Sequence, residues 1–208
     1  VMNFAALLAE DPYSIRPEDL QTISNAIQNG SQKLLNIIDE LLLLAGVRKQ
    51  ADITVFPVEM RPVIDGALHR LPIMIQEYGA EIHITEEAFP VVFAYAPWLE
   101  EIWTNYLSNA IKYGGTPPVI TIGATIESPM VRFWVSDNGN GIPAESIPLL
   151  FNQFSRPGET RIDGYGLGLS IVRRIVNRLG GDVSVETSIG QGSIFSFTLP
   201  LANQAGDP

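Results

Sequence analysis

The sequence predicts an α+β protein, in which a two-layer α/β sandwich with a mixed sheet and helices on one face follows an α-helical hairpin. Two observations carry this prediction. Apolar residues recur every three or four positions over residues 20–44, whereas short strand-like and helix-like segments alternate beyond residue 50. We therefore predict two domains, a helical hairpin over 1–50 and an α+β domain over 51–208.

The first domain carries a 3.5-residue apolar repeat. Pro17, followed by Glu18 and Asp19, suits the first turn of its main helix. A hairpin buries little apolar surface by itself, so we expect two copies to form a four-helix homodimer. The alternative is an ordinary core helix of one domain. The residues of the repeat are Leu20, Ile23, Ile27, Gly30, Leu34, Ile37, Leu41 and Leu44.

The first part of the α+β domain alternates strands with a helix. Strand-like segments cover 53–60, 81–85 and 91–95. Between the first two, Pro62 opens a helix that runs toward Tyr78, and Pro72 should kink or break it because proline removes a helical hydrogen bond.

The second part begins with a longer helix over 98–112, which Pro97 precedes. Residues 119–126 and 130–137 read as a hairpin-like pair of strands. Residues 142–165 lack a steady period and hold proline and glycine, which predicts a mobile loop.

The chain then closes with a helix and two strands. The helix covers 167–179 and is stopped by Gly180-Gly181. Strands are predicted over 182–187 and 193–199, and the residues after Pro200 read as a frayed tail.

Composition excludes several classes of site. The chain has no cysteine and two histidines, which excludes disulfides, thiolate sites and histidine-rich metal sites. The formal charge of −10 argues against general binding to nucleic acid, because that affinity comes largely from Lys and Arg.

Asn105, Asn109 and Lys112 lie on one face of the predicted helix over 98–112. An amide oxygen is a neutral hard ligand that suits Mg²⁺, and a lysine one turn along can neutralise a phosphate. The alternative is a solvated helix face with no binding role.

Asp137 directly follows a predicted strand and begins the run Asp137-Asn-Gly139-Asn-Gly141. A carboxylate there can accept a hydrogen bond from an exocyclic amine such as that of adenine, and the glycines let the backbone approach a flat base. The same letters also form an ordinary turn.

A glycine-rich loop, Gly164-Tyr-Gly166-Leu-Gly168, leads into the helix over 167–179. Backbone N–H groups at a helix N-terminus suit a phosphate. The loop is no P-loop, because no Gly-Lys-Ser/Thr follows, and its GxGxG spacing departs from the dinucleotide-binding GxGxxG fingerprint.

Phe151, Phe154 and Arg156 fall in the aperiodic stretch. Exposed aromatic residues in a mobile loop suggest a lid that docks over a ligand, with Arg156 or Arg161 reaching a phosphate. The alternative is that both phenylalanines fill the core, and the two readings are compatible.

In order and spacing, these four motifs resemble the N, G1, F and G2 boxes of the ATP-binding domain of sensor histidine kinases, over about residues 18–200. Gly190-Gln-Gly192-Ser193 adds a fifth, weaker element. The resemblance implies that Asn109 binds Mg²⁺, that Lys112 and Tyr113 contact phosphate and nucleotide, and that Asp137 reads the adenine amine. The implied nucleotide-binding residues are Asn105, Asn109, Lys112, Tyr113, Asp137, Gly139, Gly141, Ile142, Phe154, Arg156, Gly164, Gly166, Leu167 and Gly168.

The resemblance further implies ATP-dependent phosphorylation of a histidine and transfer to an aspartate of a response-regulator partner. More distant ATP-hydrolysing relatives carry a glutamate where this chain has Asn105, and an amide cannot activate water as a base. We expect the phosphoacceptor histidine to lie upstream of Val1, so no catalytic residue is assigned. His69 and His83 read as structural residues.

Two departures from the family pattern are visible. The acidic residue that often precedes the N-box helix is Tyr95 here, for which we expect little functional effect. The second is the missing phosphoacceptor, which leaves open a pseudokinase, a dimeric ATP-binding signalling scaffold without histidine phosphorylation.

No membrane segment is expected, since the longest apolar run, 41–47, is far shorter than the ~20 residues that span a bilayer. We expect a soluble, cytoplasmic chain, compatible with the cytoplasmic part of a longer membrane-attached sensor.

Overall fold

The structure, a computed structural model of the 208-residue chain, describes residues 20, 22–25, 27, 30, 53–85, 88–151 and 168–202. The chain divides into two compact units, Val1–Lys49 and Gln50–Pro208. In the first unit the described residues are helical and Ile23 is buried. The rest of the predicted hairpin lies outside the described residues.

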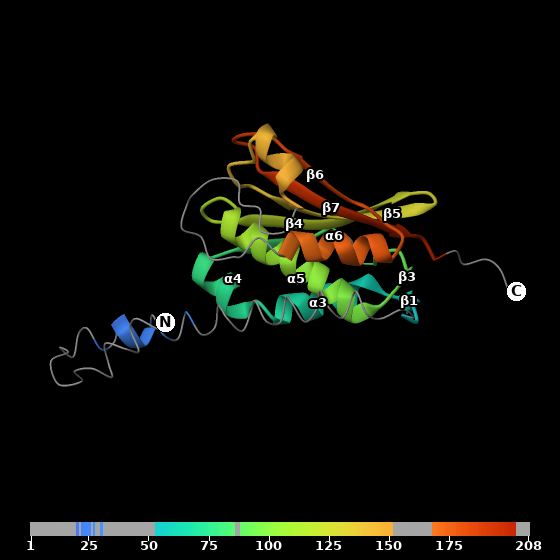
Figure 1. The fold of residues 1–208 in the computed structure, drawn as a ribbon, viewed down its shortest axis with the longest axis horizontal. Coiled ribbons are helices and arrows are strands. Elements are labelled where there is room, and N and C mark those ends of the chain that lie inside the picture. The colour runs from blue at the N-terminus through green and yellow to red at the C-terminus, as the bar shows by residue number, and fades with distance from the viewer. Residues whose placement is uncertain are drawn as a thin grey trace, which may run out of the picture. The chain divides into compact units, whose positions relative to one another are not determined.

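The second unit is built on a five-stranded mixed sheet (Figure 1). The strand order is β2-β4-β5-β7-β6; β2 runs parallel to β4, and the other neighbours are antiparallel. A separate antiparallel pair joins β1 to β3. The strands are β1 (Phe56–Val58), β2 (Glu81–Ile84), β3 (Val92–Ala94), β4 (Val119–Glu127), β5 (Met130–Asp137), β6 (Val183–Thr187) and β7 (Ser193–Pro200).

The α-helices of this unit lie on one side of the sheet, as Figure 1 shows. A 3₁₀ helix, η1 (Ala144–Leu149), follows β5. The prediction of a mixed sheet with helices on one face is therefore confirmed. The helices are α3 (Met60–His69), α4 (Pro72–Tyr78), α5 (Ala96–Tyr113) and α6 (Gly168–Arg178).

The core lies between α5 and the middle of the sheet. Trp103 of α5 is fully buried and meets Phe133 of β5 and Phe197 of β7 edge-on, with ring centroids 6.3 Å and 5.5 Å away. Its Nε1 donates a hydrogen bond to Met60 Sδ at 3.0 Å, which ties the start of α3 to α5. Such aromatic contacts favour the edge-to-face geometry seen here.

Tyr106 continues the buried face of α5. Its hydroxyl donates a hydrogen bond to the carbonyl oxygen of Ser196 at 3.2 Å, which satisfies a polar group inside the core. Burial raises the pKa of Tyr106 far above its ordinary value, so the side chain stays neutral and acts as a hydrogen-bonding core residue.

The strand predicted over 53–60 and the tail predicted after Pro200 both differ from the structure. The strand predicted over 53–60 is limited to β1, because Met60 already begins α3 and Pro62 occupies the third helical position, where the missing N–H has no partner to lose. Past Pro200, the amide of Leu201 donates a hydrogen bond to the Pro129 carbonyl and the amide of Ala202 donates one to the Val91 carbonyl, both at 3.0 Å. The predicted frayed tail is therefore hydrogen-bonded to the rest of the second unit through residue 202.

Pro72 separates α3 from α4, as predicted. It stands at the first turn of α4, and Leu71 adopts a non-helical conformation between the two helices. Gly79 then ends α4 in the left-handed conformation, with φ at 62°.

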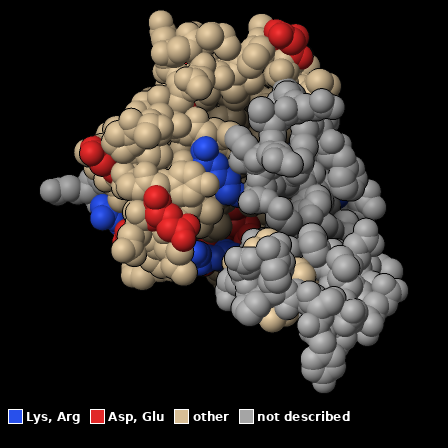
Figure 2. All heavy atoms as spheres, turned by 90° about the vertical axis from the view of Figure 1, so that its left-hand side faces the viewer, with Lys and Arg blue, Asp and Glu red and all other residues tan. Residues whose placement is uncertain are grey.

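The charged side chains visible on one face of the molecule are of mixed sign (Figure 2), with Lys and Arg close to Asp and Glu.

Over the described ranges, no helix combines the length and apolarity that crossing a bilayer requires.

Candidate functional site

Helix α5 carries four of the predicted site residues along one side. Asn105, Asn109 and Lys112 are half-buried, and Tyr113 at the end of the helix is about half exposed, at 51%. The opposite side of α5 is packed in the core. The same helix therefore holds these side chains at the border between core and surface.

Tyr95 precedes α5 at the position where the resemblance implies an acidic residue. The Tyr95 side chain makes no capping hydrogen bond, and its ring instead packs edge-on against Trp98, with centroids 5.8 Å apart. The tyrosine therefore supports the first turn of α5 by an aromatic contact.

Asn105 lies directly against Gly168, the first described residue of α6. Its Nδ2 donates a hydrogen bond to the Glu101 carbonyl at 2.9 Å, which fixes the orientation of the amide. A Cβ added to Gly168 would stand 2.0 Å from Asn105 Oδ1, so the backbone of Gly168 touches this amide. Glycine at position 168 thus lets the backbone of α6 lie in contact with Asn105.

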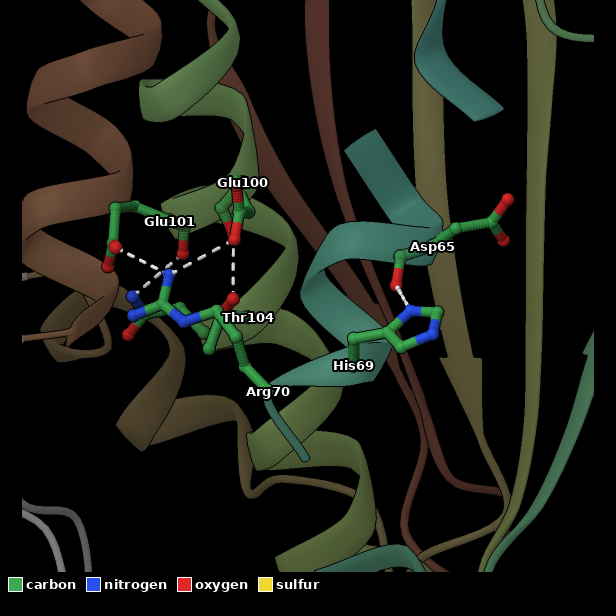
Figure 3. A network of polar contacts seen from close by, with 7 residues as sticks. Asp65, His69, Arg70, Glu100, Glu101 and Thr104 are labelled. Atoms are coloured by element: carbon green, nitrogen blue, oxygen red, sulfur yellow. Dashed lines mark hydrogen bonds and ion pairs between the residues drawn. The ribbon is translucent and has the colours of Figure 1, made fainter. Parts of the chain in front are cut away.

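The turn of α5 that precedes Asn105 is linked to α3 by an ion pair (Figure 3). Arg70, just past the end of α3, bonds to Glu101 Oε1 at 2.6 Å, and Glu100 Oε1 lies 3.7 Å from the same nitrogen. These side chains are partly exposed, so the pair contributes at most about 1 kcal/mol. The pair ties the end of α3 to the turn of α5 whose Glu101 carbonyl accepts the hydrogen bond from Asn105.

Asp137 is the last residue of the central strand β5. Its Oδ1 accepts hydrogen bonds from the backbone amides of Gly139 at 2.8 Å and Ser193 at 3.3 Å. Burial raises the pKa of the Asp137 carboxyl, and these two hydrogen bonds offset part of that rise. Both bonds fall on Oδ1, which leaves Oδ2 without a hydrogen-bond partner among the described residues.

The loop after Asp137 contacts the end of α5 and the loop after β6. A Cβ on Gly139 would stand 2.2 Å from the carbonyl oxygen of Tyr113, so only glycine fits against the end of α5. Gly141 has a φ of 71°, and a Cβ there would stand 2.1 Å from the Ser188 carbonyl oxygen. The amide of Ile142 donates to Thr187 Oγ1 at 2.9 Å.

Three of the predicted motifs therefore meet along α5. Gly168 lies at Asn105 and Gly139 lies at Tyr113, eight residues further on, which corresponds to about 12 Å along a helix. Asn109 and Lys112 lie between these two contacts. Phe154, Arg156, Gly164, Gly166 and Leu167 lie outside the described residues.

Sequence reasoning missed Ser193 and Asn138. Ser193 belongs to the weak fifth motif and received no role, yet its amide bonds to Asp137 and its hydroxyl lies 2.9 Å from Thr187 Oγ1. The strand pairing of Asp137 with Ser193 creates this contact. Asn138 also received no role; its side chain reaches back to the loop after α5 and to the first residue of β4.

Both histidines lie on elements of the second unit. The His69 ring is 2.7 Å from the carbonyl oxygen of Asp65 on its own helix, as Figure 3 shows, and His83 on β2 is largely exposed beside Glu81. Within the described ranges, no three His, Cys, Asp or Glu side chains gather as a metal cluster.

Comparisons with known proteins identify relatives of this unit. A model of the family described as "Histidine kinase-, DNA gyrase B-, and HSP90-like ATPase" matches residues 94–203. The chain is 31% identical to the phytochrome-like protein Cph1 of Synechocystis sp. over 206 residues, which cover 98% of this chain and 27% of that protein. It is 40% identical to the adaptive-response sensory kinase SasA of Synechococcus elongatus over 116 residues, which cover 54% of this chain and 30% of that protein.

A solved structure resembles the chain over most of its length. Full-length ShkA in complex with AMPPNP matches with a TM-score of 0.74 and 26% sequence identity, covering 94% of this chain and 42% of that one. The chain spans roughly a quarter to a third of the length of the curated relatives named above, at 27% and 30%.

Proposed function

Because the chain belongs to the family of histidine kinase-, DNA gyrase B- and HSP90-like ATPases, we propose that it is the ATP-binding catalytic region of a two-component sensor histidine kinase. The proposed reaction transfers the γ-phosphate of ATP to a histidine upstream of Val1. An aspartate of a response-regulator partner then receives the phosphoryl group.

The amide side chain of Asn105 is the observation that favours a kinase over an ATP hydrolase. Asn105 lies against Gly168 of α6, and its Nδ2 donates a hydrogen bond to the Glu101 carbonyl. An amide has no basic lone pair with which to remove a proton from water. The position from which hydrolysing relatives activate water is therefore chemically inert in this chain, which favours a protein side chain as the nucleophile.

The arrangement along α5 supports an extended ATP. At the Tyr113 end, Oδ2 of Asp137 would accept a hydrogen bond from the adenine amine. Toward Asn105, backbone N–H groups at the start of α6 would face phosphate oxygens, where the positive end of the helix dipole favours an anion. Lys112, between the two ends, would add a positive charge.

A magnesium ion fits this donor set. Mg²⁺ keeps several waters and takes few protein oxygens when it binds a nucleotide, so a single neutral amide such as that of Asn109 suffices. When bound, the ion would neutralise charge on the transferred phosphoryl group. The described residues offer no acidic cluster that would hold the ion without ATP.

The chemical step depends on positioning the reactants and stabilising charge, and needs no covalent intermediate on the residues of this chain. A histidine nitrogen attacks the γ-phosphorus in line with the leaving oxygen, so an N–P bond forms as the P–O bond to ADP breaks, and ADP takes the electron pair. Lys112 and the amides of α6 would stabilise charge on the phosphate oxygens during this transfer.

The experiment that tests the proposal uses two forms of the protein, the present chain and one extended upstream by ~20 residues, about 30 Å of helix. Each is incubated with γ-labelled ATP and Mg²⁺. We expect acid-labile, base-stable label on the extended form only. If ATP binds and neither form takes up label, the chain is instead a pseudokinase scaffold.

Replacing Asn109 with alanine is expected to abolish most of the Mg²⁺ dependence of ATP binding. The loss of one metal ligand should reduce the gain in affinity on adding Mg²⁺ by about tenfold, since an interaction worth ~1.4 kcal/mol changes affinity by that factor. Titration calorimetry with and without Mg²⁺ measures the gain. Asn177→Ala on the exposed part of α6 is the matched control; an unchanged Mg²⁺ effect in Asn109→Ala would assign the metal to another residue.

We further propose that the hairpin over 1–50 joins two copies of the chain. The apolar repeat that includes Leu34 and Leu41 supports this proposal. Replacing both with glutamate should convert a dimer to a monomer in light scattering, halving the measured mass, whereas Leu149→Glu, at an exposed position of the second unit, should leave the mass unchanged. A dimer that persists in the double variant would place the interface elsewhere.

A further inference from the structure

Asn138 stands between the carboxylate of Asp137 and the tight turn at Gly139, and its side chain reaches the loop that follows α5 and the first residue of β4. That loop, residues 114–118, directly continues from Lys112 and Tyr113. The side chain of Asn138 thus joins two segments that are about twenty residues apart in sequence.

Three hydrogen bonds make this junction. Asn138 Oδ1 accepts from the backbone amides of Gly115 and Val119, both at 2.8 Å. Asn138 Nδ2 donates to the carbonyl oxygen of Pro117 at 3.1 Å. One amide side chain therefore satisfies a donor and an acceptor of the loop and a donor at the start of β4, and only a group with both an acceptor and a donor can do so.

The backbones at this junction leave no spare room. A Cβ on Gly115 would stand 2.7 Å from Asn138 Nδ2 and 2.9 Å from the Asn138 carbonyl oxygen. On the neighbouring residue, the backbone of Gly139 touches the Tyr113 carbonyl, as described above. A displacement of either segment would therefore displace the other.

We propose that Asn138 is a positioning residue of the nucleotide site, which sets the separation between the adenine-reading carboxylate of Asp137 and the Lys112–Tyr113 end of α5. The inference rests on the proposed function, because it concerns the site at which ATP would bind. Asn138 acts through the backbone of its neighbours and needs no contact with the nucleotide itself. We name the three hydrogen bonds of its side chain the Asn138 clasp.

Two substitutions separate the parts of the clasp. Asn138→Ala removes all three hydrogen bonds. Asn138→Asp keeps an acceptor for Gly115 and Val119 but loses the donor to Pro117, and its oxygens repel that carbonyl. Asn177→Ala again serves as the control, since Asn177 is exposed on α6.

The first measurement is amide hydrogen exchange at Gly115 and Val119, read residue by residue by NMR. In Asn138→Ala both amides should exchange at least about tenfold faster, because they lose their acceptor. In Asn138→Asp both should stay protected. The control should match the unsubstituted protein.

The second measurement is ATP affinity, determined well below the melting temperature of each variant so that all the protein is folded. Asn138→Ala should bind ATP about tenfold more weakly, and Asn138→Asp should recover part of this loss, since restoring the acceptor restores the loop. Combined with Lys112→Ala, Asn138→Ala should lose less affinity than the two single losses predict, because the clasp acts through the position of Lys112.

Distinct outcomes separate this proposal from the proposed function. Faster exchange in Asn138→Ala with unchanged ATP affinity would overturn the positioning role and leave Asn138 a loop-stabilising residue. Unchanged exchange would overturn the clasp itself. Failure of the unsubstituted protein to bind ATP would overturn the proposed function, and the positioning role with it, even where the exchange data support the clasp.

Discussion

Replacing Asp137 with asparagine is expected to weaken ATP binding by roughly 10- to 100-fold, since a hydrogen bond to a charged group contributes ~1.5–3 kcal/mol. In the variant, the amide oxygen should keep the bonds from the amides of Gly139 and Ser193, which both fall on Oδ1. The NH₂ group then takes the position of Oδ2 and presents a donor to the adenine amine, which is also a donor. Titration of the folded variant with ATP measures the loss.

Asp182→Asn is the matched control for this substitution. Asp182 Oδ1 also accepts a backbone bond, from Val183 at 2.8 Å, and an asparagine oxygen can keep it. Asp182 is exposed at the start of β6 and has no assigned role. Equal affinities for ATP in all three proteins would refute the adenine-reading role of Asp137.

The same substitution should also change how stability depends on pH. Burial raises the pKa of Asp137 in the folded chain. A raised carboxyl pKa contributes stability that is present below the unfolded pKa and is lost as the pH rises through the folded value. Near neutral pH, Asp137→Asn should therefore melt at or above the temperature of the unsubstituted protein, and this advantage should vanish as the pH falls toward ~4.

Replacing Gly141 with alanine is expected to abolish measurable ATP binding and to lower the melting temperature. The left-handed φ of 71° costs an alanine ~1–2 kcal/mol. The added Cβ would also meet the Ser188 carbonyl oxygen at 2.1 Å, so the backbone between Asp137 and Ile142 must shift. A shift there moves the turn at Gly139 away from Tyr113. Thermal melts and ATP titration of the same sample test both effects.

Gly79→Ala separates the conformational cost from the collision. Gly79 has a similar φ of 62°, but a Cβ there meets nothing within 4 Å. Its cost of ~1 kcal/mol should lower the melting temperature by about 2–4 °C. ATP affinity should stay unchanged. If Gly141→Ala behaves like Gly79→Ala in both measurements, the contact with Ser188 is unimportant for the site.

The sheet-and-helix order of the second unit could be predicted because its signals are local. Helix α5 and the hairpin of β4 and β5 follow from proline position and apolar spacing within single segments. The strand predicted over 53–60 was too long because its apolar residues continue into the first turn of α3, and apolar spacing alone cannot separate a short strand from a helix start.

Sequence reasoning could predict a site residue only where its side-chain type and local spacing already indicate a binding role. The amides of α5 and the carboxylate of Asp137 have recognisable spacings. Asn138 and Ser193 act through partners 19 to 56 residues away, and such contacts arise only when the chain is folded. Asn138 therefore looks like any turn asparagine in the sequence, although its side chain joins two parts of the site.

Helix α5 belongs to both the core and the candidate site. Substitutions in α5 that raise thermal stability are therefore restricted, because they also affect the site. Its inner side buries Trp103 and Tyr106, while its outer side bears the amides at 105 and 109. A larger or smaller core residue would tilt the helix and disturb the outer side in the same step. We expect variants selected for growth at higher temperature to strengthen the edge strands β2 and β6 and to leave α5 unchanged.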